Sequence, residues 1–327
     1  MPVWFAVYLA LVWSQIAFSS APESMACHYK FEIQPDYFVD YFEAARQCPG
    51  KKLTTRPNLG LIDKSYNDGK QSQAVSETSL PWERFAAHIR GLNADSPDHV
   101  SYKVLFLMRH GLGVHNVFME KVGGQAWRDY WSHLDGDGNV VFRDAKLVDQ
   151  GVQQANILAG FWSKAVSELK VPLPETVYSS PLARCLETTR IVFSRLFEQL
   201  GQSLHPNIKE LLRERLTDHT CDSRSSRTWI ENNYPTFIIE PGFTENDELW
   251  KRDRSETPDE HVARKHTVLE DIFSNDPHQF IALTIHSYAM SAILRACGSE
   301  EFRIAEGSLV ALVVRAEKIG ASQLGTS

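Results

Sequence analysis

The sequence contains five polar residues whose types together suit chemistry at a phosphoryl group. Arginine offers planar, bidentate donors to phosphate oxygens. One imidazole can attack phosphorus, and a second can donate to an equatorial oxygen whose developing charge must be stabilised. A carboxyl group can protonate the leaving oxygen. The five candidates are Arg109, His110, Arg184, Glu214 and His286.

Two predicted strands carry three of these candidates at their carboxyl ends. Arg109 and His110 follow the apolar run 104–108, and His286 follows the apolar run 279–285. Short apolar runs of this kind are typical of buried central strands. Because the carboxyl ends of parallel strands meet at one crevice, we expect these side chains to lie close together.

The fourth candidate, Arg184, lies one helical turn beyond a short predicted strand, 176–179. The sequence predicts Ser180 as the N-cap of the following helix and Pro181 in its first turn. Free backbone N–H groups and the helix dipole favour an anion at such a position. Arg184 is therefore expected to face the same crevice.

The fifth candidate, Glu214, ends a segment, 207–214, that is predicted to be a strand. By period-two counting, Glu210 shares a strand face with Glu214 and is the alternative proton donor. Both carboxylates stay open as candidates on this count alone, although the Leu-Arg-Glu pattern favours Glu214.

Composition and charge restrict the fold and the partners. The chain has 327 residues, 43% of them apolar, and a formal net charge of −7. No broad basic face is available for nucleic acid. The alternation of strands and helices predicts an α/β fold, a three-layer α/β/α sandwich around a mostly parallel central sheet.

The chain is expected to form one catalytic domain with additions. Within it, a long polar loop carries His219 and Arg224, which we interpret as substrate-side residues. Loops of this length are usually lids or substrate loops. The predicted parts are an N-terminal wrap (27–102), the catalytic domain (103–318), its inserted cap loop (216–257) and a polar tail (319–327).

The first residues are interpreted separately, as a secretory signal peptide within 1–26. The run 2–18 is almost wholly apolar and small residues follow it. The alternatives are a cytoplasmic protein that starts at Met25, and a membrane anchor, for which the run is short of a span of about 20 residues. The five cysteines are scattered, without a CxxC pair, and do not decide the compartment. No membrane partner is expected once a signal is removed, and no motif predicts the oligomeric state.

Taken together, the motifs resemble the histidine phosphatase superfamily in its phosphoglycerate-mutase-like branch, and within it a fungal phosphomutase-like subgroup. The resemblance covers about residues 100–315. It implies a small phosphorylated substrate and no cofactor or metal. The motifs that carry it are Leu107-Met-Arg109-His110-Gly111, His115-Asn116, Ser179-Ser-Pro-Leu-Ala-Arg184, Leu212-Arg213-Glu214 and Ile285-His286-Ser287.

The resemblance also implies roles for the candidates. His110 would be the nucleophile that carries a phosphohistidine, and Glu214 would be the proton donor and then the base. Asn116 would add a hydrogen bond to the phosphoryl group, although it could instead cap a turn. The residues that would bind and polarise the phosphoryl group are Arg109, Arg184 and His286.

Differences from the motifs of two related groups of enzymes reduce the number of functions that the sequence favours. The acid-phosphatase and phytase branch is expected to show Arg-His-Gly-x-Arg-x-Pro, but after Gly111 this chain follows another pattern, with Val114 inside the motif. It also has Ser287 where that branch has aspartate. Sugar-phosphate mutases are expected to show Trp-Asn where this chain has His115-Asn116. The sequence therefore favours a metal-independent phosphatase, with a phosphomutase and a non-catalytic phospho-ligand-binding protein as alternatives.

Overall fold

The computed structural model describes residues 28–48, 50, 52–66 and 79–320. The predicted signal peptide and most of the predicted polar tail lie outside these residues. Within them, no helix combines the length and apolar character that crossing a bilayer requires.

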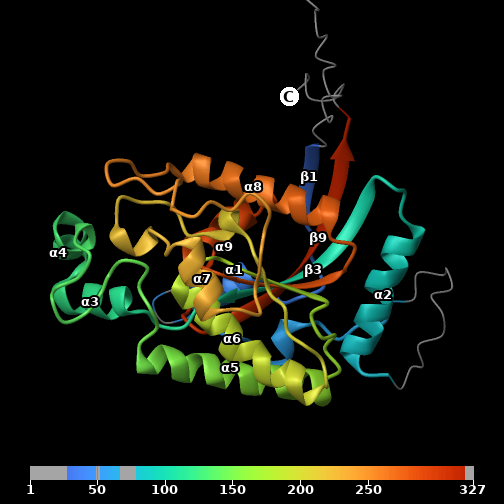
Figure 1. Ribbon diagram of the computed structural model, residues 1–327. Coiled ribbons are helices and arrows are strands. Elements are labelled where there is room, and N and C mark those ends of the chain that lie inside the picture. The colour runs from blue at the N-terminus through green and yellow to red at the C-terminus, as the bar shows by residue number, and fades with distance from the viewer. Residues whose placement is uncertain (1–27, 49, 51, 67–78, 321–327) are drawn as a thin grey trace, which may run out of the picture.

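A seven-stranded mixed sheet forms the centre of the molecule (Figure 1). The strand β9 (Leu309–Ile319) is antiparallel to both of its neighbours, β1 (His28–Ile33) and β3 (Val100–Arg109). All the other neighbouring strands are parallel to each other. The mostly parallel sheet predicted from the sequence is confirmed. In spatial order the strands are β1 (His28–Ile33), β9 (Leu309–Ile319), β3 (Val100–Arg109), β7 (Phe280–Ile285), β4 (Thr176–Ser179), β5 (Asn207–Ile208) and β6 (Ile238–Ile239).

Helices cover both faces of the sheet, with α8 above it and α5 and α6 below it in Figure 1. On the lower face, Phe106 of β3 contacts Trp82 of α2 and Trp162 of α5. On the upper face α9 packs beside α8, and Phe273 of α8 contacts Phe31 of β1. The three-layer sandwich is confirmed. The helices are α2 (Pro81–Asp95), α5 (Asp149–Ser167), α6 (Ala183–Gln199), α8 (Pro258–Asn275) and α9 (Ser287–Ala296).

The register between β3 and β7 brings the two histidine motifs together. The strands are parallel, and Arg109 pairs with Ile285. The backbone N–H of His110 then donates to the carbonyl oxygen of Ile285 at 3.1 Å. His110 and His286 therefore leave neighbouring strands at the same level. The fully buried side chains of 104–108 and 280–285 hold both strands in the core.

Both regions predicted as additions also contribute strands to the sheet. β1 lies in the predicted wrap and extends one edge, and β6 lies in the predicted cap loop and ends the other. The N-terminal segment is therefore part of the sheet as well as a wrap packed on it, and the cap loop also contributes a strand. The alternating pattern of β1 is short, and β6 has two residues, so neither strand has a clear sequence signal.

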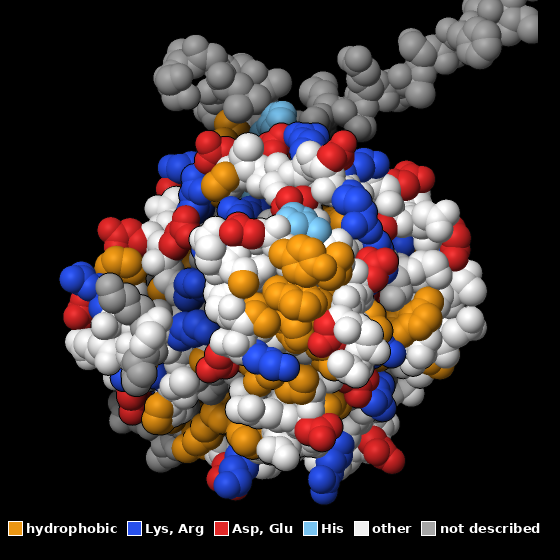
Figure 2. Space-filling model, turned by 90° about the vertical axis from the view of Figure 1, so that its left-hand side faces the viewer, with side chains coloured by type: hydrophobic (Ala, Val, Ile, Leu, Met, Phe, Trp, Pro, Cys, Tyr) orange, Lys and Arg blue, Asp and Glu red, His pale blue; other side chains and the backbone are white. Residues whose placement is uncertain are grey.

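Several short elements cover the carboxyl end of the sheet. Figure 2 shows the molecule from the left-hand side of Figure 1, where α3 and α4 lie, and apolar side chains gather on this face. A small parallel sheet of two strands pairs residues 52–53 with 303–304. The short elements are α1 (Tyr41–Arg46), β2 (Lys52–Leu53), η2 (Pro57–Gly60), α3 (Val114–Val122), α4 (Gly124–Asp129), η3 (Trp131–His133), η4 (Glu210–Leu212), η5 (Thr220–Asp222), α7 (Arg227–Asn233) and β8 (Arg303–Ile304).

Candidate active site

A cavity of about 720 Å³ opens at the carboxyl ends of the parallel strands. Four of the five predicted catalytic residues line it, and the fifth, His286, lies directly behind, with its ring centroid 5.0 Å from that of His110. Two further candidates also line it, Asn116 and His219. The structure therefore brings together the residues that the sequence placed at separate strand ends.

The ring of His110 is oriented by the residue that follows it. Its Nδ1 lies 2.7 Å from the carbonyl oxygen of Gly111. A carbonyl oxygen only accepts hydrogen bonds, so Nδ1 carries the proton and Nε2 keeps its lone pair. Burial, together with the charges of Arg184 and Arg109, lowers the pKa of His110 well below its usual range. The imidazole is therefore neutral, which is the state a nucleophile needs.

The loop after His110 is tied to the helices behind it. The backbone N–H of Gly111 donates to Thr188 Oγ1 at 3.1 Å, and that of Leu112 donates to Gln154 Oε1 at 2.8 Å. The carbonyl of Leu112 in turn accepts from the N–H of Val148 at 3.0 Å. These contacts fix the loop to α6 and to the start of α5.

Two buried arginines beside His110 have hydrogen-bond donors that no protein atom accepts from in the described part of the chain. Arg109 donates from Nη1 to the carbonyl of Ile304 and pairs through Nη2 with Glu306 at 2.7 Å. Arg184 donates from Nη1 to the carbonyl of Cys221 at 2.8 Å. The Nε atoms of both arginines are buried and have no hydrogen-bond partner in the described part of the chain. Each can still donate to an anion.

His286 contacts Ser180, a residue that was predicted from the sequence to be a helix N-cap. Nε2 of His286 lies 2.8 Å from Ser180 Oγ. The helix α6 begins at Ala183, so the prediction of Ser180 as its N-cap is wrong. The carboxylate of Asp144 accepts from the N–H of Ala183 at 2.8 Å, so the cap comes from a distant segment. Burial and the charge of Arg184 lower the pKa of His286.

Glu214 lies in the cavity, but no strand carries it there. β5 ends at Ile208 and a 3-10 helix, Glu210–Leu212, follows, so the predicted strand 207–214 is wrong beyond its first two residues. Glu214 Oε1 accepts from the N–H of Arg215 at 3.0 Å, and Oε2 accepts from the N–H of Tyr288 at 3.2 Å. Burial, and then the nearby charge of Asp222, raises the pKa of Glu214. A raised pKa suits a proton donor.

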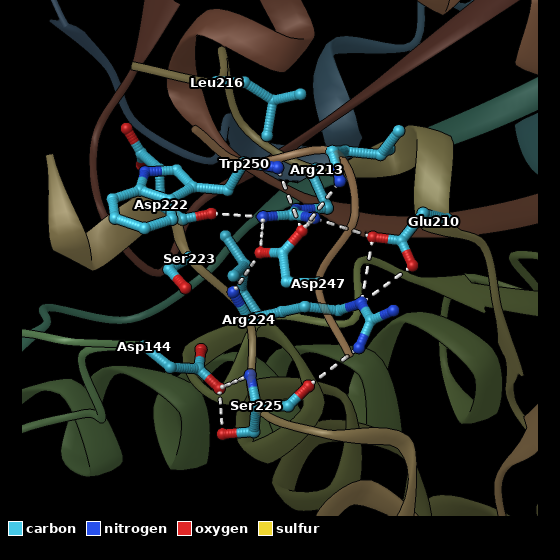
Figure 3. Close-up of polar contacts among 12 residues, drawn as sticks. Asp144, Glu210, Arg213, Leu216, Asp222, Ser223, Arg224, Ser225, Asp247 and Trp250 are labelled. Atoms are coloured by element: carbon cyan, nitrogen blue, oxygen red, sulfur yellow. Dashed lines mark hydrogen bonds and ion pairs between the residues drawn. The ribbon is translucent and has the colours of Figure 1, made fainter. Parts of the chain in front are cut away.

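The alternative donor, Glu210, lies outside this cavity in a buried ion-pair network (Figure 3). Its carboxylate pairs with Arg213 Nη1 at 2.8 Å and with Arg224 Nε at 2.8 Å. Asp247 pairs with Arg213 at 2.7 Å. The same-face counting failed because the 3-10 helix turns Glu210 away from Glu214.

Arg224 is also outside the cavity that His110 lines, which corrects its interpretation as a substrate-side residue. Its guanidinium is buried, lies 4.1 Å from the ring centroid of Phe243, and donates to backbone carbonyls of 244–246. These contacts hold the cap together. The other loop candidate, His219, lines the cavity and stays a prediction.

Asn116 caps a turn, which is one of its two predicted roles. Its Oδ1 accepts from the N–H of Gly113 at 3.0 Å at the start of α3, so it caps a turn. It also lines the cavity. A phosphate contact through its amide nitrogen stays a prediction.

Two cavity residues were not assigned a role from the sequence. His115 is partly buried, and its ring centroid lies 6.2 Å from that of His110. Asp222 accepts a hydrogen bond from Thr217 Oγ1, and its Oδ1 lies 3.7 Å from Arg184 Nη2. His115 belongs to the His115-Asn116 motif, which was the signal for it, whereas Asp222 was signalled only by its closeness in sequence to the loop candidates His219 and Arg224.

One group of described residues could in principle hold a metal ion: the potential ligand atoms of His219, Cys221 and Asp222 lie within 4.8 Å of one another. Two features oppose a cation there. Burial raises the pKa of the Cys221 thiol well above its usual range, and thiolate is the form that binds metals. The guanidinium of Arg184 lies beside Asp222 and repels a cation. We therefore assign no metal to these residues.

Known proteins match this chain in sequence. The family model for the histidine phosphatase superfamily (branch 1) matches residues 140–319. A protein of Arthroderma benhamiae named "Probable phosphoglycerate mutase" is 43% identical over 262 residues, which are 80% of this chain and 78% of that protein. "Phosphomutase-like protein 3" of Candida albicans is 34% identical over 264 residues, which are 80% and 76% of the two chains. The solved phosphoglycerate mutase of Thermus thermophilus aligns at 19% identity with a TM-score of 0.34, over 64% of this chain and 91% of that one.

Proposed function

The chain belongs to the histidine phosphatase superfamily, and on this premise we propose that it is a metal-independent phosphatase. It hydrolyses a small-molecule phosphomonoester through a phosphohistidine on His110. The observation that carries this proposal is the contact of His110 Nδ1 with the Gly111 carbonyl at 2.7 Å. That contact leaves Nε2 as the nucleophilic atom, inside a group of buried cationic side chains.

In the first step, Nε2 of His110 attacks phosphorus and the bond from phosphorus to the ester oxygen breaks. Glu214, in the protonated form that its raised pKa favours, gives its proton to the leaving oxygen. Arg109 and Arg184 bind the equatorial oxygens and offset their charge. His286 supports the same oxygens from behind His110. The alcohol then departs.

In the second step, the carboxylate of Glu214 takes a proton from water, and the water oxygen attacks phosphorus. The bond between phosphorus and Nε2 breaks, which releases inorganic phosphate and returns His110 to its starting state. The two arginines supply the positive charge that a metal ion supplies in other phosphotransfer sites. We therefore expect turnover to survive a chelator.

The experiment compares turnover of an aryl phosphate by the purified protein and by His110→Ala, with and without a chelator. We expect the substitution to abolish turnover and the chelator to leave it unchanged. Equal turnover by the two proteins shows that His110 is not the nucleophile. Loss of turnover with the chelator, restored by a divalent cation, shows that the reaction needs a metal.

A phosphomutase is the second candidate, because two relatives carry mutase names. It uses the same first step, but the phosphoryl group returns to a hydroxyl of the substrate rather than to water. The ratio of isomerised ester to free phosphate distinguishes the two. We expect free phosphate to dominate.

A non-catalytic phospho-ligand-binding protein is the third candidate. The observation against it is that His110, Arg109, Arg184 and Glu214 all line one cavity. Binding of phosphate esters without a phosphoenzyme on rapid quench would favour this candidate.

A further inference from the structure

Two side chains of α8 bind the backbone of the segment that ends at Glu214. Lys265 Nζ donates to the carbonyl oxygens of Leu211 and Arg213, each at 2.5 Å. Arg264 Nη1 donates to the same two carbonyls at 3.0 and 3.1 Å. Arg264 Nη2 donates to the carbonyl of Glu214 at 2.8 Å. These contacts fasten the backbone of the segment to α8.

The last residues of this segment belong to no helix or strand. β5 ends at Ile208, and the 3-10 helix that follows ends at Leu212. Arg213 and Glu214 lie beyond both elements. Buried carbonyl groups need hydrogen-bond donors, and a strand or helix would supply them from its own backbone. Here the side chains of α8 supply them, so one substitution can remove a donor.

Lys265 is the less expected of the two donors. Its side chain is fully buried, and no carboxylate lies within ion-pair distance of it in the described part of the chain. Arg264, by contrast, pairs with Glu256 at 2.7 Å. Burying an ammonium group without a paired carboxylate costs free energy, and an apolar side chain of similar volume avoids that cost. The contacts of Lys265 therefore point to a role in placing the segment.

The carboxyl group of Glu214 is the part of the segment that reaches the cavity. It accepts from the backbone N–H of Arg215 at 3.0 Å and from that of Tyr288, in the first turn of α9, at 3.2 Å. A shift of the 211–214 backbone would move this carboxyl group away from the Tyr288 N–H. It would also move it away from the leaving oxygen, and proton transfer needs hydrogen-bond distance.

We propose that Lys265 is a positioning residue for the proton donor. It binds the carbonyls of Leu211 and Arg213 and so holds the Glu214 carboxyl group within reach of the leaving oxygen. Lys265 itself touches neither the substrate nor the phosphoryl group. This inference rests on the proposed function, since that function makes Glu214 the proton donor.

The test separates proton donation from attack on phosphorus. An alkyl phosphate needs the donor, whereas the phenolate of an aryl phosphate leaves without a proton. Lys265→Met should lower the ratio of alkyl to aryl kcat/KM about tenfold or more, as misplacement of a catalytic group does. Lys265→Gln keeps N–H donors on a shorter side chain and should show a smaller loss of the same ratio. A change that merely destabilises the fold would lower both rates together.

Lys103 provides a matched control. It is also a buried lysine, and its Nζ donates to the carbonyls of Asp276 at 2.5 Å and His278 at 2.6 Å. It does not line the cavity. Lys103→Met therefore removes an equivalent set of contacts away from the proton donor, and it should leave the ratio of alkyl to aryl turnover unchanged. Thermal unfolding of both variants sets an assay temperature at which each is folded.

The outcomes separate this inference from the proposed function. An unchanged ratio in Lys265→Met, with turnover that still depends on His110, would overturn the positioning role and leave the proposed function standing. The same loss of ratio in Lys103→Met would also overturn it. Turnover that persists in His110→Ala would instead overturn the proposed function.

Hydrogen exchange followed by mass spectrometry adds a readout that needs no turnover. The backbone of 209–216 should exchange faster in Lys265→Met than in Lys103→Met, because the first variant alone loses the donors to this segment. Equal exchange of 209–216 in the two variants would show that Lys265 does not hold the segment, and the inference would then be wrong whatever the turnover.

Discussion

Gly111 and Gly151 meet backbone to backbone beneath the cavity. A Cβ placed on Gly111 would lie 2.3 Å from the carbonyl oxygen of Gly151, and one placed on Gly151 would lie 2.1 Å from the carbonyl oxygen of Leu112. Real Cβ atoms do not approach backbone oxygens so closely. The loop that follows His110 can therefore pack on the start of α5 only because both positions are glycine.

The first prediction follows from this contact. Gly151→Ala should destabilise the protein by about 1–3 kcal/mol, as overpacking does, and should lower aryl phosphate turnover by displacing His110. Gly160→Ala is the control, since Gly160 lies in the same helix and an added Cβ meets nothing within 4 Å. That substitution should stabilise the protein by about 0.5–1 kcal/mol. Denaturant unfolding measures both, and equal behaviour of the two variants would show that the close approach is not needed.

The second prediction distinguishes Glu214 from Glu210. Glu214→Gln should lower turnover of an alkyl phosphate about 10²–10⁴-fold, and turnover of an aryl phosphate much less, because a phenolate leaves without a proton. Glu210→Gln should leave the ratio of alkyl to aryl turnover unchanged and instead lower stability, since it leaves Arg213 and Arg224 short of a partner. A selective loss of alkyl turnover in Glu210→Gln would reverse the assignment.

The third prediction concerns pH. The proposed donor works only while protonated, so alkyl phosphate turnover should fall as pH rises through the raised pKa of Glu214. The charge of Asp222 contributes to that raised pKa. Asp222→Asn should therefore lower the pKa of Glu214 and move the descending limb of the kcat/KM profile to lower pH. Asp137→Asn, in an exposed turn, should leave the limb in place. A limb that stays fixed in Asp222→Asn would show that another group produces it.

The fourth prediction is that Arg224 stabilises the folded protein. Removing one partner from a buried pair typically costs about 3–5 kcal/mol, and Arg224→Ala breaks its pair with Glu210 and its packing on Phe243. Arg227→Ala breaks an exposed pair with Glu231 and one hydrogen bond to the carbonyl of Phe243, and should cost at most about 1 kcal/mol. Urea unfolding measures the difference. Equal stabilities of the two variants would mean that the network in Figure 3 does not hold the cap.

The sequence predicted the centre of this protein better than its edges. The apolar runs before His110 and His286 gave two central strands, because only buried strands need such continuous apolar runs. The segment ending at Glu214 was predicted as a strand from its apolar residues. In the structure, only two residues of β5 pair with neighbouring strands. The backbone carbonyls of the following segment, 211–214, accept hydrogen bonds from Arg264 and Lys265 of α8 instead.

The burial of charged residues in the cap was even harder to predict from the sequence. No feature of the sequence predicts that Arg213 and Arg224 are buried. Both are buried in the structure, where Glu210 and Asp247 contact them. Such pairings join positions up to 34 residues apart, and no periodicity encodes them.

The most direct test of the account is to find the phosphoryl group on the protein. The protein is mixed with an aryl phosphate, quenched in alkali within one turnover, digested and examined by mass spectrometry. We predict a phosphoryl group on His110 that is lost in acid and that is absent from His110→Ala. Steady turnover with no phosphorylated peptide, or with the phosphoryl group on another residue, would contradict the assignment of His110 as the nucleophile.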